Sequence, residues 1–336
     1  MARVDVRRGM PSVELPREEF EKRFRSRFAD PAFRPLQREI DAIVEAAWDG
    51  YRNSRKAPVT RKAGTGFADP DYEISVDWLA AREAVLAAQR RHDDRDETPR
   101  ILLVNGSSRS EHTCPGEMSK SWRLVKIAEP VFQEMGLAVD ILDLSRLTSE
   151  FGKQIHPCKS CVATSMALCH WPCSCYPNYA LGQTDDWMNE IYPLWVAAHG
   201  VMIVAPVNWY HAPTGLKAMM DRLVCADGGN PDPSSTHGKK ADQAKALELK
   251  GWPYPRHLAG RHFGSSSTAT ARAPKPCAVR LRTGSPTCRL FRPAEPRKWM
   301  AISAIWNLTR LRIRRWTRTK PFRRKRATRR AHSATP

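Results

Sequence analysis

This sequence of 336 residues contains no long apolar run. No stretch approaches the roughly 20 apolar residues that a membrane-spanning helix needs, so we expect no transmembrane segment. The first residues, Met-Ala-Arg-Val-Asp-Val-Arg-Arg, include no apolar stretch of the kind found in secretory signals, and we therefore expect a cytoplasmic protein. With 41% hydrophobic and 27% charged residues, the chain has the composition of one or two globular domains.

Acidic residues are almost absent from the last part of the chain. Residues 265–336 hold 20 of the 55 Lys and Arg residues but only one of the 35 acidic residues, Glu295. Residues 1–264 are therefore nearly neutral, and nearly all of the net charge of +20 belongs to the tail. Arg323–Arg326 could bind nucleic acid, but this segment has neither helix nor strand periodicity. We interpret residues 265–336 as a disordered or frame-shifted tail, which makes nucleic-acid binding the least favoured function.

Residues 1–98 have the pattern of a helical extension. Phe20, Phe24 and Phe28 recur at helical spacing, and residues 36–51 carry an amphipathic apolar stripe. Ser75 precedes a third helical pattern and has the side chain of an N-cap. We expect this extension to serve packing or oligomerisation, and we find no candidate for chemistry in it.

Residues 99–264 alternate between strand and helix patterns. Continuous apolar runs at 101–104 and 201–204 predict buried parallel strands, residues 139–144 predict an edge strand, and residues 257–263 predict the start of a fourth strand. Helices are expected at 117–135, 185–198 and 214–223 between these strands. The pattern predicts a flavodoxin-like three-layer α/β/α sandwich with parallel strand order 2-1-3-4-5, whose last strands are lost. Ligands bind such sheets at the carboxyl ends of the first and third strands.

Two loops at those strand ends carry the candidate binding residues. The loop after the first strand is rich in small hydroxyl residues ahead of a helix, a composition that suits a phosphate group. The loop after the third strand, Pro206–Pro213, combines proline and aromatic residues, which can form a flat, partly apolar wall for a heterocycle.

These features together resemble the NAD(P)H-dependent FMN reductase-like flavoproteins, including their multimeric flavodoxin and iron–sulfur flavoprotein branches. The resemblance rests on Gly-Ser-x-Arg after the first strand and on Gln183-x-Asp-Asp-Trp187 in the connection that follows. It also rests on Pro-x-x-x-Tyr after the third strand, with Pro213, Leu216-Lys217 and Asp221-Arg222. It implies that the FMN phosphate is held by Ser107, Arg109, Ser110 and Thr113. It also implies an isoalloxazine site lined by Pro206, Asn208, Trp209 and Tyr210, with Asp227 and Gly228 at its other end. The sequence departs from the family in its phosphate loop, where Glu111-His112-Thr113 replaces the common Gly-Asn-Thr.

Five cysteines lie within one short segment: Cys158, Cys161, Cys169, Cys173 and Cys175. In a chain without an export signal, such spacing favours a metal or a cluster over disulfides. The first pair resembles the iron–sulfur flavoproteins, but their third cysteine would fall at Thr164. The spacing also differs from ferredoxin and zinc-ribbon patterns, so a 4Fe–4S cluster, zinc and free redox-active thiols all remain open.

The resemblance implies an FMN-dependent oxidoreductase that uses NAD(P)H and an unidentified electron acceptor, and that forms a homo-oligomer. No catalytic side chain is expected, because the flavin itself supplies the chemistry. The alternative is a flavodoxin-type electron carrier with a metal or cluster bound by the cysteines. Read in a second frame, the codons of residues 298–310 permit Met-Asp-Gly-Tyr-Ile-Gly-Tyr-Met-Glu-Pro-Tyr-Ala, which resembles the C-terminal part of this family.

Overall fold

The computed structural model describes residues 9–114 and 116–268. Four parallel strands form the main sheet in the order β4-β3-β5-β6. They comprise β3 (Arg100–Asn105), β4 (Ala138–Asp143), β5 (Gly200–Pro206) and β6 (His262–Thr268). The order is that of a flavodoxin-like sheet as far as its fourth strand, and it confirms the predicted fold class. The place of a fifth strand lies outside the described residues.

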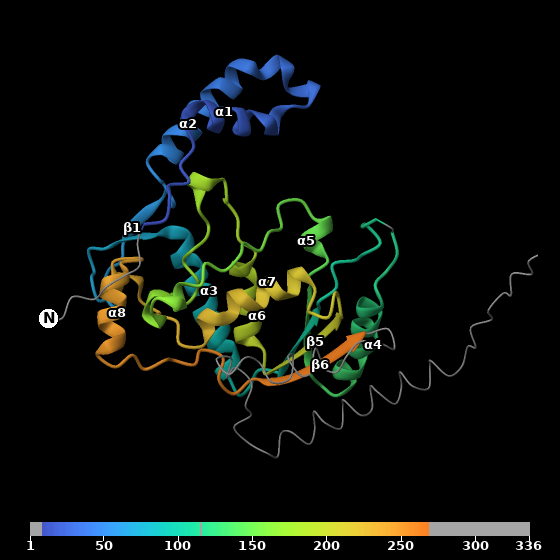
Figure 1. Cartoon of the computed structure of the whole chain (residues 1–336). Helices are drawn as coiled ribbons and strands as arrows, with labels where there is room; N and C mark the ends of the chain where they lie inside the picture. Colours follow the sequence, from blue (N-terminus) through green and yellow to red (C-terminus); the bar gives the residue numbers. More distant parts are fainter. Residues whose placement is uncertain (1–8, 115, 269–336) are drawn as a thin grey trace, which may run out of the picture. The chain divides into compact units, whose positions relative to one another are not determined.

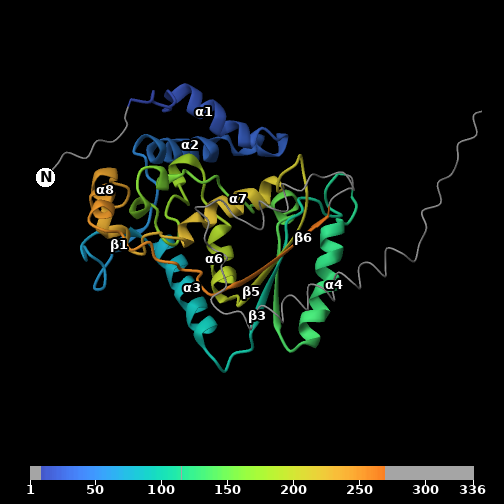
Figure 2. The ribbon, with the colours of Figure 1, turned by 60° about the horizontal axis from the view of Figure 1, so that its bottom comes forward.

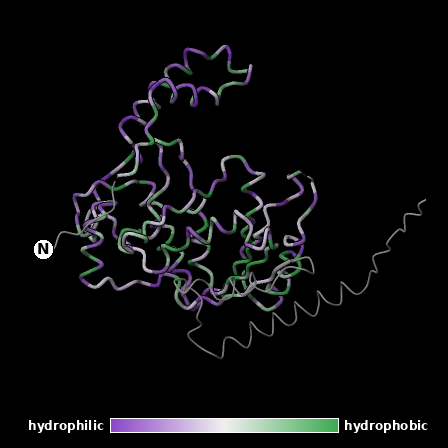
Figure 3. Tube along the Cα trace, viewed as in Figure 1, coloured by the Kyte–Doolittle hydropathy of each residue, from purple (hydrophilic) through white to green (hydrophobic). Residues whose placement is uncertain are grey.

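Helices cover both faces of this sheet (Figure 2). Helix α4 (Lys120–Glu134) lies on one side, and α6 (Met188–Ala197) and α7 (Thr214–Arg222) lie on the other, where α3 (Val76–Asp93) packs against α6. The buried strands β3 and β5 are almost wholly apolar, as expected for strands that are covered on both faces (Figure 3). The result is the predicted three-layer arrangement.

Local signals in the sequence account for several element boundaries. Ser75 caps α3 as predicted, because its Oγ accepts a hydrogen bond from the N–H of Trp78 at 3.4 Å. Helix α4 begins at Lys120, three residues later than predicted, because Ser119 caps it through a 3.0 Å bond from the N–H of Trp122. Strand β6 runs from His262 to Thr268, beyond the end predicted for this domain at Gly264. No helix in residues 9–114 or 116–268 is long and apolar enough to cross a membrane.

The N-terminal helices α1 (Arg17–Arg25) and α2 (Gln37–Arg52) form a hairpin held by aromatic side chains (Figure 1). Phe20 stacks on Tyr51 with ring centroids 4.7 Å apart and contacts Trp48 at 5.3 Å. A short antiparallel pair, β1 (Thr60–Lys62) and β2 (Glu73–Ser75), leads from this hairpin into α3. Helix α5 (Arg146–Ser149) follows β4, and α8 (Ala241–Leu249) precedes the segment that enters β6.

Candidate functional site

The loops after β3 and β5 lie side by side. The two strands pair in parallel with Asn105 opposite Val204, and the N–H of Gly106 donates a 2.8 Å hydrogen bond to the carbonyl of Val204. A Cβ at Gly106 would lie 2.7 Å from the Cβ of Ala205 and 2.8 Å from the side chain of Leu216. Glycine is therefore required for this close approach, which places both predicted binding loops side by side at the carboxyl ends of the strands.

The predicted phosphate residues form one continuous turn, residues 107–113, which we call the phosphate turn. Ser107 is buried, and its Oγ accepts a 3.1 Å hydrogen bond from the N–H of Arg109. The Oγ1 of Thr113 accepts from the N–H of Ser110 at 3.1 Å and donates to the Ser110 carbonyl at 2.7 Å. The turn thus brings all four predicted residues together and leaves the Arg109 side chain at its rim, half exposed.

Arg109 has an unused donor. One terminal nitrogen of its guanidinium lies 2.8 Å from a carboxylate oxygen of Glu117, whose side chain is exposed. Its Nε is buried and has no hydrogen-bond partner among the described residues. A buried guanidinium N–H without an acceptor fits a site for an anionic group such as the FMN phosphate.

The loop after β5 contains a strained turn, residues 208–211, which we call the aromatic turn. Asn208 and His211 exchange backbone hydrogen bonds of 2.9 and 2.8 Å, with Trp209 and Tyr210 between them at φ +47° and +62°. Two-residue turns of this kind favour Asn-Gly, because positive φ costs other residues about 1–2 kcal/mol each. Trp209 is 95% exposed and Tyr210 is 72% exposed, so packing against the protein does not offset this strain. Strained, exposed aromatic side chains beside the phosphate turn are typical of a binding surface.

Asp227 and Gly228 contact the segment that leads into β6. The N–H of Gly228 donates to the carbonyl of Pro255 at 2.7 Å, and Asp227 forms a backbone bridge with Arg256. Both contacts tie this segment to the chain that enters β6 at its amino end. The contacts of the described residues therefore bring the first two predicted loops together, but they do not bring Asp227 and Gly228 to them.

The cysteine segment forms a mostly buried thiol cluster. The Sγ atoms of Cys161 and Cys175 lie 3.6 Å apart, and Cys169 and Cys173 are buried close by, whereas Cys158 is only partly buried. Within the described part of the chain, no three His, Cys, Asp or Glu side chains are placed so that they could share a metal ion. Thiolates are suitable donors for zinc or an iron–sulfur cluster.

Two lysines lie beside this thiol cluster, and no sequence pattern pointed to either of them. Lys239 Nζ lies 3.8 Å from Cys161 Sγ and donates to the carbonyl of Leu168 at 2.8 Å. Lys56 donates to the carbonyl of Ser174 within the cysteine segment. Because the lysines are distant from the cysteines in sequence, only the folded structure reveals this positive charge beside the thiols.

The thiols of this cluster differ in acidity. The hydrogen bond with Cys175 lowers the pKa of Cys161 to about 7, and nearby Lys239 acts in the same direction against the effect of burial. Burial raises the pKa of Cys169, and it also raises that of Cys225, which lies outside the cysteine segment. Cys161 is therefore the thiol that these contacts make reactive near neutral pH.

Residues 99–242 match the family model of the NADPH-dependent FMN reductases. This match confirms the resemblance to these flavoproteins that the sequence predicts. The chain is also similar to the iron-sulfur flavoprotein of Methanosarcina thermophila, with 30% identity over 125 residues. That alignment covers 37% of this chain and 52% of the relative, so the chain spans about half the length of the curated relative it matches.

Proposed function

We propose that this protein is an FMN-dependent oxidoreductase that takes hydride from NAD(P)H and passes electrons to a quinone, a free flavin or another acceptor. The observation that carries the proposal is the juxtaposition of the phosphate turn and the aromatic turn at the carboxyl ends of β3 and β5. Flavodoxin-like proteins bind their ligand at the carboxyl ends of the strands of their open parallel sheet.

The residues of the two turns have distinct roles in this proposal. Ser107, Arg109, Ser110 and Thr113 bind the phosphate, and Arg109 supplies the charge-assisted contact. Pro206, Asn208, Trp209 and Tyr210 orient the ring system and shield one side of it from water. Bound FMN would accept the hydride and pass on the electrons, so we assign no side chain as an acid or a base.

Flavin titration tests the site directly. FMN fluorescence should be quenched on binding, and Arg109→Ala should weaken binding by roughly tenfold to a hundredfold, the value of one charge-assisted hydrogen bond of about 1.5–3 kcal/mol. Arg38→Ala, which changes an exposed arginine of α2, is the matched control. A protein that leaves the fluorescence of FMN unchanged would overturn the proposal. Steady-state oxidation of NADH and NADPH by the flavin-loaded protein then identifies the hydride donor.

A flavodoxin-type electron carrier with metal at the cysteines is the second candidate. The buried thiol cluster with Lys239 and Lys56 beside it supports this candidate, because cationic side chains offset the negative charge of thiolate ligands. Similarity to an iron-sulfur flavoprotein supports it as well. Protein prepared without oxygen should then contain iron or zinc, and Cys161→Ser should lower that content while Cys114→Ser, which changes an exposed cysteine, should not. Slow or absent steady-state NAD(P)H oxidation would favour the carrier over the reductase.

Further features of the proposal concern location and assembly. We propose a cytoplasmic homo-oligomer whose partners are a nicotinamide dinucleotide and an electron acceptor. Sedimentation of the full chain tests the oligomeric state. Residues 265–268 of the predicted basic tail form the end of β6, whereas Arg323–Arg326, the candidate nucleic-acid contact, lies outside the described residues.

A further inference from the structure

A cavity lies at the opposite end of the sheet from the two turns. Its volume is about 450 Å³, and its walls come from α3, the cysteine segment and the chain that enters β6. Arg261 lines it and directly precedes β6, whereas the phosphate and aromatic turns follow β3 and β5. Because all these strands are parallel, the cavity lies at the amino ends of the strands and the proposed flavin site at their carboxyl ends.

Arg261 is a buried arginine whose hydrogen bonds go to neutral oxygens. It is 6% exposed, and its terminal nitrogens donate to neutral oxygens, among them the Val196 carbonyl at 2.6 Å and the Gln89 side chain at 3.0 Å. Its Nε has no partner among the described residues, and Asp93 acts on its charge electrostatically rather than through a hydrogen bond. Arg222, buried to a similar degree, is instead paired with Asp186. A buried charge is normally paired in direct contact, so the guanidinium of Arg261 calls for an anion.

The rest of the cavity wall is also cationic. Arg82 and Arg256 line it together with Arg261, against a single carboxylate, Asp93. That carboxylate already accepts hydrogen bonds from Gln89 at 2.8 Å and interacts with His92 at 3.0 Å. Three arginines thus face one engaged carboxylate, which leaves a net positive cavity.

Aromatic rings complete the wall. Trp171 and His257, which both line the cavity, stack with ring centroids 5.1 Å apart and planes only 10° from parallel. The His257 Nε2 is held 2.8 Å from the carbonyl of Gly229, so this stack is fixed in place. A cavity with rigid aromatic walls and convergent polar groups is typical of small-molecule sites, and its volume lies in their usual range.

We propose that this cavity binds a small organic anion through its phosphate or carboxylate group, held by Arg261, Arg256 and Arg82. The site is separate from the proposed flavin site and does not depend on it. A ligand here would sit against α3 of the N-terminal extension and the entry to β6, and would therefore join these two parts of the molecule.

Calorimetric titration of the full chain with inorganic phosphate and with benzoate tests the proposal, in the presence of excess FMN so that the phosphate turn is occupied. At least one probe should bind with a stoichiometry of one, and which of them binds identifies the charged group. Arg256→Ala, a change at an exposed arginine, should weaken binding at least fivefold, and Arg261→Gln should abolish it. Arg91→Ala, on the same α3 helix but not lining the cavity, should change nothing.

Several outcomes would overturn the proposal. One is the absence of binding by either probe up to about 10 mM, where affinity is no longer specific. Another is unchanged affinity in Arg256→Ala, and a third is binding that Arg109→Ala removes, which would assign the anion to the phosphate turn. If circular dichroism shows that Arg261→Gln does not fold, Arg256→Ala and Arg82→Ala decide the question by themselves.

Discussion

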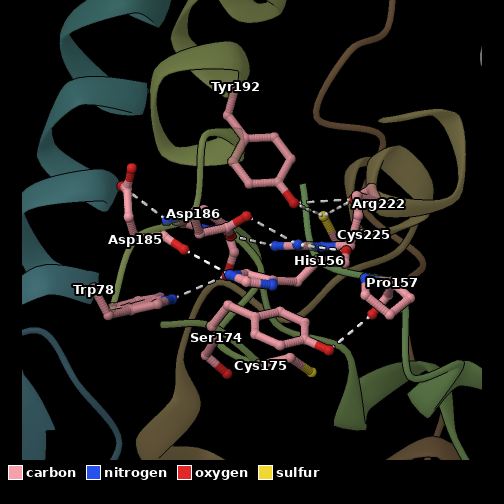
Figure 4. Close-up of polar contacts among 12 residues, drawn as sticks. Trp78, His156, Pro157, Ser174, Cys175, Asp185, Asp186, Tyr192, Arg222 and Cys225 are labelled. Carbon is pink, nitrogen blue, oxygen red and sulfur yellow. Dashed lines mark hydrogen bonds and ion pairs between the residues drawn. The ribbon is translucent and has the colours of Figure 1, made fainter. Parts of the chain in front are cut away.

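The carboxylate of Asp186 and the guanidinium of Arg222 form a two-pronged ion pair in which both side chains are completely buried (Figure 4). The two bonds measure 3.1 and 2.5 Å, and Arg222 also donates to the carbonyl of His156 at 3.0 Å. Asp186 ends the long connection that carries the cysteines, and Arg222 ends α7, the helix that follows the aromatic turn. The pair therefore fastens the cysteine segment to the helix behind the proposed flavin site.

Removing one partner of this pair should be costly. Asp186→Asn leaves the Arg222 charge buried without a counterion, and we expect the free energy of unfolding to fall by about 3–5 kcal/mol. Urea denaturation followed by circular dichroism measures the loss. Asp185→Asn, a neighbouring change at an exposed aspartate, should cost less than about 0.5 kcal/mol. Equal stability of the two variants would contradict the assigned role of the pair.

The strained aromatic turn predicts a trade between stability and flavin binding. Replacing Trp209 and Tyr210 together by Asn and Gly supplies residues that tolerate positive φ, so the free energy of unfolding should rise by about 1 kcal/mol. The same change removes the aromatic wall, and the affinity for FMN should fall at least tenfold.

Tyr254 provides a matched control for this turn. It is another half-exposed aromatic residue at positive φ, +46°, and it lies outside the turn. Tyr254→Gly should leave FMN affinity unchanged in fluorescence titration. If the turn variant binds FMN as tightly as the original chain, the aromatic side chains do not form the ring site.

A buried histidine, His170, and a partly buried one, His257, predict a loss of stability in acid. Burial lowers the pKa of His170, which lies between Ser174 and Thr236, and also lowers that of His257. The unfolded chain therefore binds more protons than the folded chain once the pH falls below about 6.5. Stability from this source is present above pH 6.5 and declines below it, by up to about 1.4 kcal/mol per pH unit for each histidine.

Urea denaturation at pH 7.5, 6.5 and 5.5 measures this slope. His170→Asn, which cannot gain a proton, should flatten it, whereas His112→Asn, at an exposed histidine, should not. A slope that is the same in both variants would show that His170 does not carry the effect.

The thiol of Cys161 should be selectively alkylated. In reduced, metal-free protein its reaction with iodoacetamide should increase with pH around its pKa of about 7, since only the thiolate reacts. Buried Cys169 and Cys225 should remain unmodified in the folded protein when peptides are analysed by mass spectrometry. Lys239→Met should shift the pH dependence of Cys161 upward. A reaction rate that does not depend on Lys239 would contradict the assigned charge effect.

The strands that carry their own apolar pattern could be predicted from the sequence. Residues 101–104 and 201–204 lie within β3 and β5 as expected, because strands covered on both faces must be apolar. The predicted start of a fourth strand at 257–263 was early, since β6 covers His262–Thr268. Its second half is rich in serine, and pairing with β5, rather than its own pattern, makes it a strand.

Contacts between distant residues could not be predicted in this way. Asp186 and Arg222 stood in recognised motifs, yet nothing in either motif indicated that the two would pair across 36 positions. Lys239 reaches Cys161 from 78 positions away. Positive φ at Trp209 and Tyr210 also had no local signal, because these residue types disfavour that conformation and the surrounding structure imposes it.

The reading frame of the C-terminal segment is the last prediction. The sheet is described up to Thr268, and a flavodoxin-like sheet of order 2-1-3-4-5 requires a further strand from the residues that follow. Those residues instead carry the basic composition that a GC-rich gene produces out of frame. Trp and Met each have a single codon, so the bases of Trp299 and Met300 are known. Read from the third base of the Lys298 codon, these bases encode Met or Val, followed by Asp.

Resequencing the gene decides this point. We expect a second frame that is open from the region of codon 268 past codon 336 and that contains Met-Asp-Gly-Tyr-Ile-Gly-Tyr-Met-Glu-Pro-Tyr-Ala. Protein expressed from the restored frame should bind FMN more tightly than the present chain, because the completed sheet supports both turns. A stop codon in that frame before codon 336 would contradict the prediction. The basic tail would then be a genuine part of the protein, and its charge would need another explanation.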